Sequence, residues 1–462
     1  MFSKFKKKYI GDAAFYKYYI MLATPMIIQN AITNFVSFLD NIMVGQLGQE
    51  AISAVATVNQ LNFVFSLAVF GVASAGSIYG AQFFGKGDHV GHMHTFRFKL
   101  YGTLLVTILG ICIFLMFGGN LISLFLTETG SGASKELALD LGLKYLRIIL
   151  VGLVPFAVTQ AYATNIKETG QTLIPMEAGM AAVVTNAVLD YCFIFGIGPI
   201  PAMGVQGAAL ATVIARYIEC ALVVFWAHTH QEKNKYLKRA FEGFGMPADI
   251  LKQILLKGAP LMLNEVLWAA GISAVTQSYS IRGMNVLTAI SISNTVNNLF
   301  NIVFIQLGAC ISIVVGQNLG AGKLKEAKDA DNKMIAFSVA CCTVMAIIMF
   351  LCGGLFPKIY NVPEEVRKLA TSFIAVMALW MPFCSFSHCS YFTLRSGGKT
   401  IVTFLFDSVF TWVIMAPLAF VLAHFTSLGI VTVYFLVQGT ELIKCIIGYF
   451  MVKSNVWLVQ MV

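Results

Sequence analysis

The stretch GAQFFGKG, residues 80–87, recurs as VGQNLGAG, residues 315–322, and this repeat decides how the chain is organised. Gln82 and Gln317 hold the same place in the two stretches and lie 235 residues apart. A later match, ETGQT (168–172) with SGGKT (396–400), has an offset of 228. Matches at a nearly constant offset predict two halves that arose by duplication. The offset of 235 also aligns Pro25 with Pro260, Ala54 with Ala289, Asn59 with Asn294, Asn62 with Asn297 and Phe65 with Phe300.

The composition predicts an all-α membrane protein. Of 462 residues, 58% are hydrophobic and 11% are charged, and the mean hydropathy is +0.78, whereas soluble domains are about a quarter charged. The hydrophobic residues form continuous blocks of about 20 or more, as in helices that cross about 30 Å of hydrocarbon. Barrel strands would alternate in polarity. We predict twelve transmembrane helices over residues 18–44, 52–82, 98–126, 139–163, 173–196, 205–229, 258–281, 286–316, 334–356, 368–392, 401–423 and 429–452.

One long loop divides the predicted spans six and six. We therefore predict an N-terminal domain over residues 1–229, a cytoplasmic linker over 230–257 and a C-terminal domain over 258–462. Basic residues, with Arg97 and Lys99 among them, concentrate on the side of the N-terminus, which predicts cytoplasmic termini. Because each half has six spans, we expect two parallel six-helix bundles related by a pseudo-twofold axis normal to the membrane.

Other classes of protein fit the sequence poorly. The net charge is +9, but the basic residues are assigned to short loops, so no nucleic acid is expected as a partner. The ten cysteines lie in apolar blocks without metal-ligand spacing. The histidines lack it too, and we interpret all of them, including His92, as structural or solvent-exposed. We expect no enzyme, no cofactor and no bound metal beyond a transported ion.

Acidic residues inside predicted spans are candidates for function, because each costs about 2.5–3.5 kcal/mol at the centre of a helix. Asp40 and Asp190 are expected near the outer ends of the first and fifth spans, at similar depth in one half. Asn186 precedes Asp190 by one turn and shares its face. Two carboxylates and an amide oxygen suit proton exchange or a bound Na⁺. Alternatively, Asp40 caps the next loop and Asp190 faces interfacial water.

The second half has Glu265 as its main unpaired acid. We interpret Glu265 as a residue for coupling or for binding a cationic substrate, with a satisfied buried group as the alternative. Asp407 has no obvious basic partner, and its role is left open. Two pairs with i, i+3 spacing are predicted to neutralise their own charges, namely Arg216 with Glu219 and Glu441 with Lys444.

Prolines and asparagines mark places where helices bend or associate. Pro25 and Pro260 each remove one backbone hydrogen bond from the first span of a half. Each proline is interpreted either as a moving hinge or as a static kink. Asparagines recur every three or four residues and either line a cleft or join helices, with joining favoured. They are Asn59, Asn62, Asn294, Asn297, Asn298 and Asn301.

The sequence resembles one family of transporters over nearly its full length. FLDNIMVGQLG (38–48), AISAVA (51–56), ETGQTLIPM (168–176) and both copies of the repeated motif are similar to motifs of the multidrug and toxic compound extrusion (MATE) family. This resemblance implies antiport of organic cations and similar drugs against H⁺ or Na⁺.

The resemblance also implies which residues bind the coupling cation. They are Asp40, Asn186 and Asp190, with Thr212 as a weaker match, whereas Glu265 stands where many members have an acid in the seventh span. Some members have a further acid in the tenth span. Here that stretch reads MPFCSFSHCSYF, residues 381–392, and contains none.

We therefore expect a secondary active antiporter that exports small organic compounds, often cationic and drug-like, by alternating access. Its expected partners are the organic substrate and the lipid bilayer, and we expect a monomer in the plasma membrane, a bacterial inner membrane. A lipid-linked oligosaccharide flippase would need a cleft lined with Arg and Lys, which are assigned to loops here. A channel would need a selectivity filter, which is not visible. Nothing in the sequence separates H⁺ from Na⁺.

Overall fold

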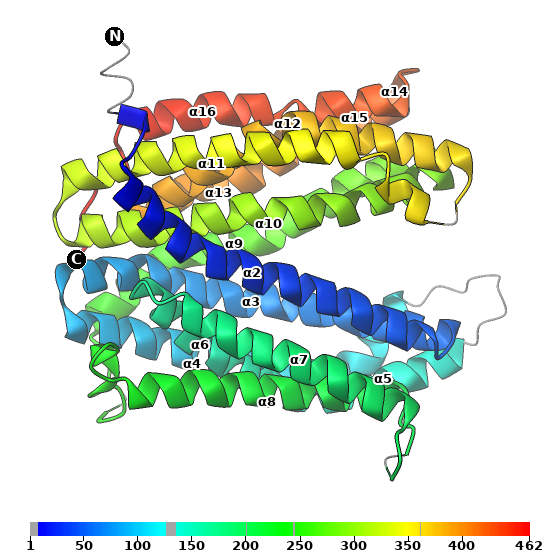
Figure 1. Cartoon of the computed structure of the whole chain (residues 1–462), viewed down its shortest axis with the longest axis horizontal. Coiled ribbons are helices and arrows are strands. Elements are labelled where there is room, and N and C mark those ends of the chain that lie inside the picture. Colours follow the sequence, from blue (N-terminus) through cyan, green and yellow to red (C-terminus); the bar gives the residue numbers. More distant parts are fainter. Residues whose placement is uncertain (1–7, 126–134, 200, 244, 361) are drawn as a thin grey trace. The chain divides into compact units, whose positions relative to one another are not determined.

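The protein is described by a computed structural model over residues 8–125, 135–199, 201–243, 245–360 and 362–462. The expected all-α fold class is confirmed, because long helices joined by short turns make up the described residues (Figure 1). The α-helices are α2 (Ala13–Gly45), α3 (Gln49–Lys86), α4 (His89–Phe125), α5 (Lys135–Val151), α6 (Leu153–Glu168), α7 (Leu173–Phe195), α8 (Val205–Thr229), α9 (Ala248–Ser280), α10 (Met284–Gly320), α11 (Leu324–Cys352), α12 (Glu364–Ser396), α13 (Thr400–Phe404), α14 (Ala416–Phe425), α15 (Ile430–Gln438) and α16 (Glu441–Lys453). The other helical elements are two short 3₁₀ turns, η1 (Lys235–Leu237) and η2 (Phe356–Ile359), and two π-helical segments, η3 (Leu405–Val409) and η4 (Thr411–Met415).

The predicted twelve spans agree with the helices. Among the described residues, eleven segments are long and apolar enough to cross a membrane, and α5 with α6 makes a twelfth that is bent by 44°. The bend has a local cause. Pro155 has no N–H to donate to the carbonyl of Val151, and Gly152 stands at the break. The hydroxyl of Tyr217 donates to that carbonyl at 3.5 Å.

Contacts divide the chain into two compact units. The N-terminal unit comprises Ile28–Gly80 and His89–Lys252, and the C-terminal unit comprises Met1–Ile27, Ala81–Asp88 and Gln253–Val462. The predicted domain limits follow the order of the sequence, whereas these contacts assign the start of α2 and the end of α3 to the C-terminal unit. The boundary within α2 falls just after Pro25.

Apolar residues of α3, α5 and α8 form the main core of the N-terminal unit, with Val58 and Ile149 buried in it. The predicted linker is attached to this unit through Arg97. Its guanidinium donates to the backbone carbonyls of Arg239, Ala240 and Gly245, each at 2.8 Å. Arg97 is 6% exposed. Its assignment to a loop on the basis of charge is therefore wrong, and the residue is a buried structural contact.

The C-terminal unit packs α10, α12 and the last helices around Phe373 and Tyr434, which are both buried. The first turns of α2 belong to this unit, because the hydroxyl of Tyr19 donates to the carbonyl of Leu307 in α10 at 3.0 Å. Predicted span 401–423 is one long helical segment, but two π-helical turns, η3 and η4, interrupt its α-helical hydrogen bonding.

The repeated motif has a structural function within the C-terminal unit. A side chain at Gly85 would overlap the backbone carbonyl of Gln317, and a side chain at Gly320 would overlap that of Gln82. The two copies of the motif therefore cross backbone to backbone, and each supplies a glycine at the crossing. Gln82 also donates to the carbonyl of Ser396 at 2.9 Å.

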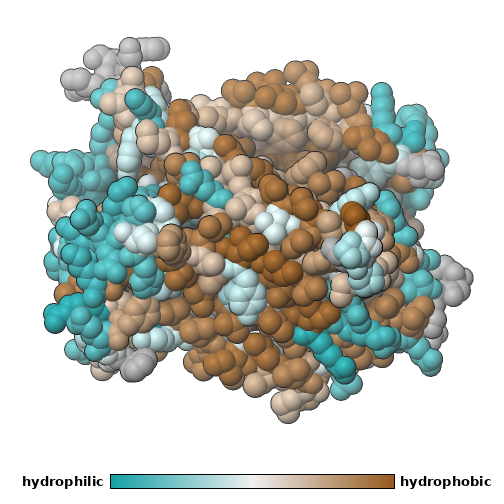
Figure 2. All heavy atoms as spheres, turned by 60° about the horizontal axis from the view of Figure 1, so that its bottom comes forward, coloured by the Kyte–Doolittle hydropathy of each residue, from teal (hydrophilic) through white to brown (hydrophobic). Residues whose placement is uncertain are grey.

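The surface has the polarity of a membrane protein. Figure 2 shows hydrophobic residues across the middle of one face and hydrophilic residues gathered toward its two ends. Large apolar side chains of α4, including Leu115 and Met116, are more than half exposed. A surface of this kind is stable in contact with lipid.

Candidate functional site

Asp40 of α2 and Asp190 of α7 lie together in the N-terminal unit. Asp190 is fully buried, and the charges of the two carboxylates interact. Within the described part of the chain, three of their oxygens have no hydrogen-bond partner. They are both carboxylate oxygens of Asp190 and Oδ1 of Asp40. The alternative in which Asp190 faces interfacial water is therefore wrong. A buried and a partly buried carboxylate that repel each other favour a proton or a cation between them.

Asn186 and Thr212 complete the predicted set. The amide of Asn186 donates to the hydroxyl of Thr212 across 3.5 Å, which joins α7 to α8. Asn186 also interacts with the carboxylate of Asp190, although without a hydrogen bond of ordinary geometry. All four residues named for a cation site are thus neighbours, with oxygens of the kind that Na⁺ binds. Their role remains a prediction.

Tyr145 of α5 is a member of this cluster that the sequence did not single out. Its ring is 2% exposed, and its hydroxyl donates to Asn59 Oδ1 at 3.4 Å. The hydroxyl also interacts with Thr212 and lies within reach of the charges of Asp40 and Asp190. One tyrosine among 16 in the chain carries no sequence signal of its own. The contact with Asn59 joins α3 to α5, which is the role that the sequence favours for the recurring asparagines.

Arg216 of α8 is the basic residue beside this cluster. Its charge interacts with Tyr145 and with Glu219, and its guanidinium carbon lies 5.3 Å from the ring centroid of Phe156. No direct ion pair joins Arg216 to Glu219 in the part of the chain that the structure describes. Because the two charges still interact electrostatically, the predicted local neutralisation of this pair stays a prediction.

The C-terminal unit holds a second polar cluster at the π-helical segment η3. Asn264 of α9 is 2% exposed and donates to Asp407 Oδ2 at 3.1 Å. Ser408 donates to Asn264 Oδ1 through its hydroxyl at 2.6 Å and through its backbone N–H at 3.3 Å. A π-bulge frees backbone groups for such contacts, and π-bulges are frequent at functional sites.

Lys444 of α16 supplies the partner that Asp407 lacked in the sequence. Its ammonium group lies 3.3 Å from Asp407 Oδ1 and 3.4 Å from Glu441 Oε1. Lys444 is 5% exposed and lies 5.3 Å from the ring centroid of Phe410. The predicted Glu441–Lys444 pair is confirmed, and Asp407 extends it to a carboxylate–ammonium–carboxylate triad.

Glu265 is less isolated than the sequence predicts. It lies in α9 next to Asn264, and its charge interacts with Arg395, a buried residue of α12, and with Asp407. Tyr391 interacts with the same three charged groups. In the part of the chain that the structure describes, Glu265 forms no direct ion pair, and Arg395 acts on it only through a charge interaction at longer range. Its role in coupling or substrate binding stays a prediction.

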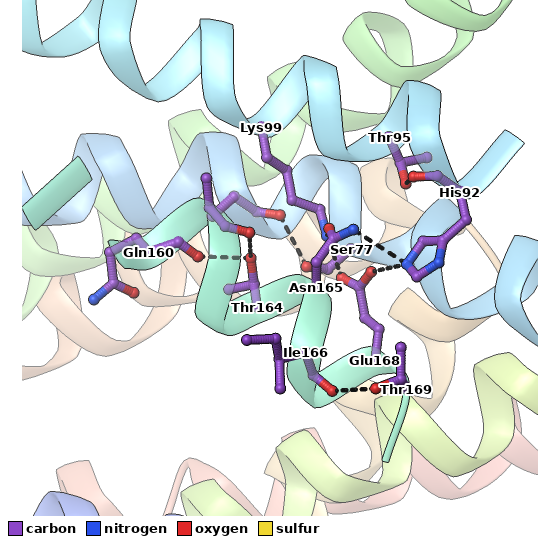
Figure 3. A network of polar contacts seen from close by, with 12 residues as sticks. Ser77, His92, Thr95, Lys99, Gln160, Thr164, Asn165, Ile166, Glu168 and Thr169 are labelled. Carbon is purple, nitrogen blue, oxygen red and sulfur yellow. Dashed lines mark hydrogen bonds and ion pairs between the residues drawn. The ribbon is translucent and has the colours of Figure 1, made fainter. Parts of the chain in front are cut away.

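A third network of polar side chains lies in the N-terminal unit, and the sequence does not predict it. Figure 3 shows Lys99 and His92 beside Glu168, with Asn165 in contact with both Lys99 and His92. Lys99 donates to Glu168 and to Asn165, and His92 Nε2 lies 3.3 Å from Glu168 Oε2. Lys99 is fully buried, so its assignment to a loop is wrong. Gly80 of α3 leaves room for the carboxylate, which a side chain there would strike.

Comparisons with known proteins place the chain in a family. The MatE family model matches residues 25–192 and 260–421. A probable multidrug resistance protein YoeA of Bacillus subtilis is 23% identical over 423 residues, which cover 90% of this chain and 88% of that protein. A probable multidrug resistance protein NorM of Thermotoga maritima is 22% identical, over 89% of this chain and 86% of that one.

Solved structures have the same fold. The crystal structure of a MATE protein in the bent conformation superposes with a TM-score of 0.85 at 19% identity and covers 96% of this chain and 95% of that one. An outward-facing multidrug resistance MATE family transporter of the MOP superfamily gives a TM-score of 0.84 at 18% identity, over 95% of both chains. Because the family model matches most of both halves, the chain belongs to the MatE family of membrane transporters.

Proposed function

We propose that this protein is a secondary active antiporter that exports small organic compounds in exchange for H⁺ or Na⁺. The observation that carries the proposal is the buried carboxylate of Asp190, which lies beside Asp40 with no hydrogen-bond partner among the described residues. A buried charge without a partner is costly in a membrane protein and is retained where it has a function. Binding of one cation would compensate the charge repulsion and the missing hydrogen bonds.

The neighbours of the two aspartates support this role. Asn186 and Thr212 supply neutral oxygens for Na⁺, and the Tyr145 hydroxyl can orient a protonated carboxyl group. Arg216 is close enough for its charge to act on the cluster through Tyr145. The geometry supports H⁺ and Na⁺ equally, and both would enter from the outer side of the membrane.

We propose that the conformational change of transport takes place in the first helix, α2. Pro25 weakens the backbone hydrogen bonding of α2, and the helix passes from the C-terminal to the N-terminal unit just after it. Asp40 lies on the same helix, so a cation at Asp40 can bias the bend. Crystal structures of MATE proteins are known in a bent and in a straight conformation. Pro260 holds the corresponding place in α9.

The driving force comes from the membrane. Moving one charge through the membrane potential supplies about 2.3 kcal/mol per 100 mV. In the predicted orientation, with cytoplasmic termini in a bacterial inner membrane, an inward flow of cations would drive the export of substrate. The relatives are named as probable multidrug resistance proteins, which supports drug-like organic compounds as the substrate class.

Coupling is proposed to be asymmetric between the halves. In the C-terminal unit the ammonium group of Lys444 already occupies the place between Asp407 and Glu441. An internal cation leaves no room for a transported one there. Glu265, whose charge interacts with that of Arg395, is the remaining acid that a cationic substrate could reach.

The buried basic residues do not favour a lipid-linked oligosaccharide flippase. The charge of Lys99 is neutralised by Glu168, that of Lys444 by Asp407 and Glu441, and Arg97 binds three backbone carbonyls. Each of these three cations is therefore already engaged by the protein and is not offered to a pyrophosphate group.

The proposal is tested in proteoliposomes loaded with ethidium as a fluorescent organic cation. An imposed gradient of H⁺ or of Na⁺ is expected to drive ethidium transport against its own gradient in the wild type, and one of the two ions is expected to suffice. Asp40→Asn should abolish uphill transport. Asp140→Asn, which breaks an exposed pair with Lys144, is the matched control and should transport normally. Equal uphill transport by Asp40→Asn would contradict the proposal.

A further inference from the structure

A cavity in the C-terminal unit is separate from both acidic clusters. Its volume is about 330 Å³, and it is lined by Lys8 and Tyr9 at the start of the described chain, by one face of α11 and by the end of α16. Phe386 of α12 and Trp457 contribute apolar surface. None of its lining residues takes part in the proposed transport mechanism.

The chemistry of the cavity changes along α11. Lys328 lies at one end, Asp331 follows one turn later, and Ile335 and Val339 continue the same face. The distance from Lys328 to Val339 along the helix is about 16 Å, at 1.5 Å per residue. On α16 the order is matched, since Lys453 ends the helix and Tyr449 precedes it by one turn. Basic groups thus lie at one end and apolar groups at the other.

Three lysines at the basic end are not neutralised by acids. Lys8, Lys328 and Lys453 form no ion pair within the described part of the chain, whereas nearby Lys323 and Lys333 pair with Glu326 and Asp329. Lys8 and Lys453 instead lie over the rings of Tyr9 and Tyr449, at 4.9 and 5.4 Å from the ring centroids. The ammonium groups are therefore available to an anion.

Asp331 supplies a buried acceptor between the two ends. It is fully buried, and its Oδ1 accepts from the hydroxyl of Thr393 at 2.5 Å. Its Oδ2 has no hydrogen-bond partner among the described residues. Because Asp331 lines the cavity, a small movement of its side chain would let a hydroxyl group of a ligand donate to this oxygen.

We propose that the cavity binds one anionic phospholipid of the cytoplasmic leaflet, with its phosphate at the lysines and an acyl chain along Ile335 and Val339. In the predicted orientation the basic end lies at the cytoplasmic surface, where anionic lipids meet basic pockets between helices. A free phosphate would use only the lysines and would leave the apolar length of the cavity in contact with water. Phosphatidylglycerol fits best, because its head group also carries hydroxyl groups for Asp331.

Binding is measured by native mass spectrometry of the full-length protein in a neutral detergent, titrated with phosphatidylglycerol, phosphatidylcholine or inorganic phosphate. One phosphatidylglycerol molecule is expected to bind more tightly than phosphatidylcholine. Each lysine at such a site contributes about a fivefold change in affinity. Lys328→Gln should therefore weaken binding of phosphatidylglycerol about fivefold, and Lys328→Gln with Lys453→Gln more strongly. Lys325→Gln, an exposed lysine of the same helix outside the cavity, should leave it unchanged.

A second variant separates a lipid from a phosphate ion. Ala336→Trp fills the apolar end of the cavity and keeps every lysine, so it should lose phosphatidylglycerol while its melting temperature in detergent shows that it is folded. The proposal is overturned if phosphatidylcholine binds equally well, if Lys325→Gln weakens binding as much as Lys328→Gln, or if inorganic phosphate displaces the lipid at equal concentration.

Discussion

Lys444 Nζ lies 3.3 Å from Asp407 Oδ1 and forms the centre of a triad with Glu441. The N-terminal unit differs, because Asp190 is fully buried and has no hydrogen-bonding partner among the described residues. In the C-terminal half a lysine thus lies between two acids, whereas among the described residues no basic side chain forms an ion pair with Asp40 or Asp190. This difference is the physical basis for assigning ion coupling to the N-terminal half.

The triad predicts a large loss of stability when its cation is removed. Lys444→Met leaves the buried Glu441 and the partly buried Asp407 without their shared partner, and breaking a buried ion pair from one side costs about 3–5 kcal/mol. Thermal unfolding in detergent should show this loss. Lys444→Met with Asp407→Asn should recover part of it. The exposed Lys358→Met is the control and should unfold like the wild type.

The Lys99–Glu168 pair is expected to hold the helices of the N-terminal unit together. Lys99→Met should destabilise the protein by about 3–5 kcal/mol because Glu168 would remain buried and charged. The double variant with Glu168→Gln should lose less than the sum of the two single variants. Additive losses in chemical unfolding would argue against a direct interaction. Lys144→Met, at an exposed pair with Asp140, should change stability by less than about 1 kcal/mol.

The crossing of the repeated motifs tolerates no side chain at Gly85. Gly85→Ala would place a methyl group on the backbone carbonyl of Gln317, which cannot move aside as a flexible side chain can. A destabilisation of about 1–3 kcal/mol or more is expected from overpacking. Gly119→Ala, in a helix with open space around the new methyl group, should be neutral or should stabilise the protein by about 0.5–1 kcal/mol. Equal melting temperatures for the two variants would rule out the crossing.

Much of the fold could be predicted because its signals are local or repeated. The hydrophobic blocks predict the spans, and the offset of 235 identifies the glycines that cross, although not the crossing itself. Asp40, Asp190 and Asn186 could be proposed as one site because acids in spans are rare and Asn186 lies one turn from Asp190. The bend between α5 and α6 was missed, although Gly152 and Pro155 are visible in the sequence.

The remaining site residues depend on contacts between helices that are distant in the sequence. Lys99 reads as the end of a cytoplasmic loop until Glu168 and Asn165 are placed beside it. Asp407 and Lys444 lie on different helices, and no spacing rule connects them. A lysine and an acid that are both within hydrophobic blocks are nevertheless a usable signal, since each is costly alone.

Tyr145 offers a test of the cation site that leaves both carboxylates intact. Tyr145→Phe removes the hydroxyl that donates to Asn59 and interacts with Thr212. One lost hydrogen bond corresponds to about 0.5–1.5 kcal/mol, which is a two- to tenfold weaker affinity for the coupling ion. The measurement is the ion concentration that gives half-maximal ethidium transport. An unchanged value would place Tyr145 outside the site, and Tyr101→Phe on α4 is the control.

If Asp190 binds the coupling ion, its substitution should separate two modes of transport, which can be compared in one set of proteoliposomes. Asp190→Asn should retain exchange of labelled for unlabelled ethidium, because exchange needs the substrate site and alternating access alone. The same variant should show no ethidium transport driven by a gradient of H⁺ or Na⁺. If Asp190→Asn retains gradient-driven transport at the wild-type rate, Asp190 does not couple the ion and the account is contradicted.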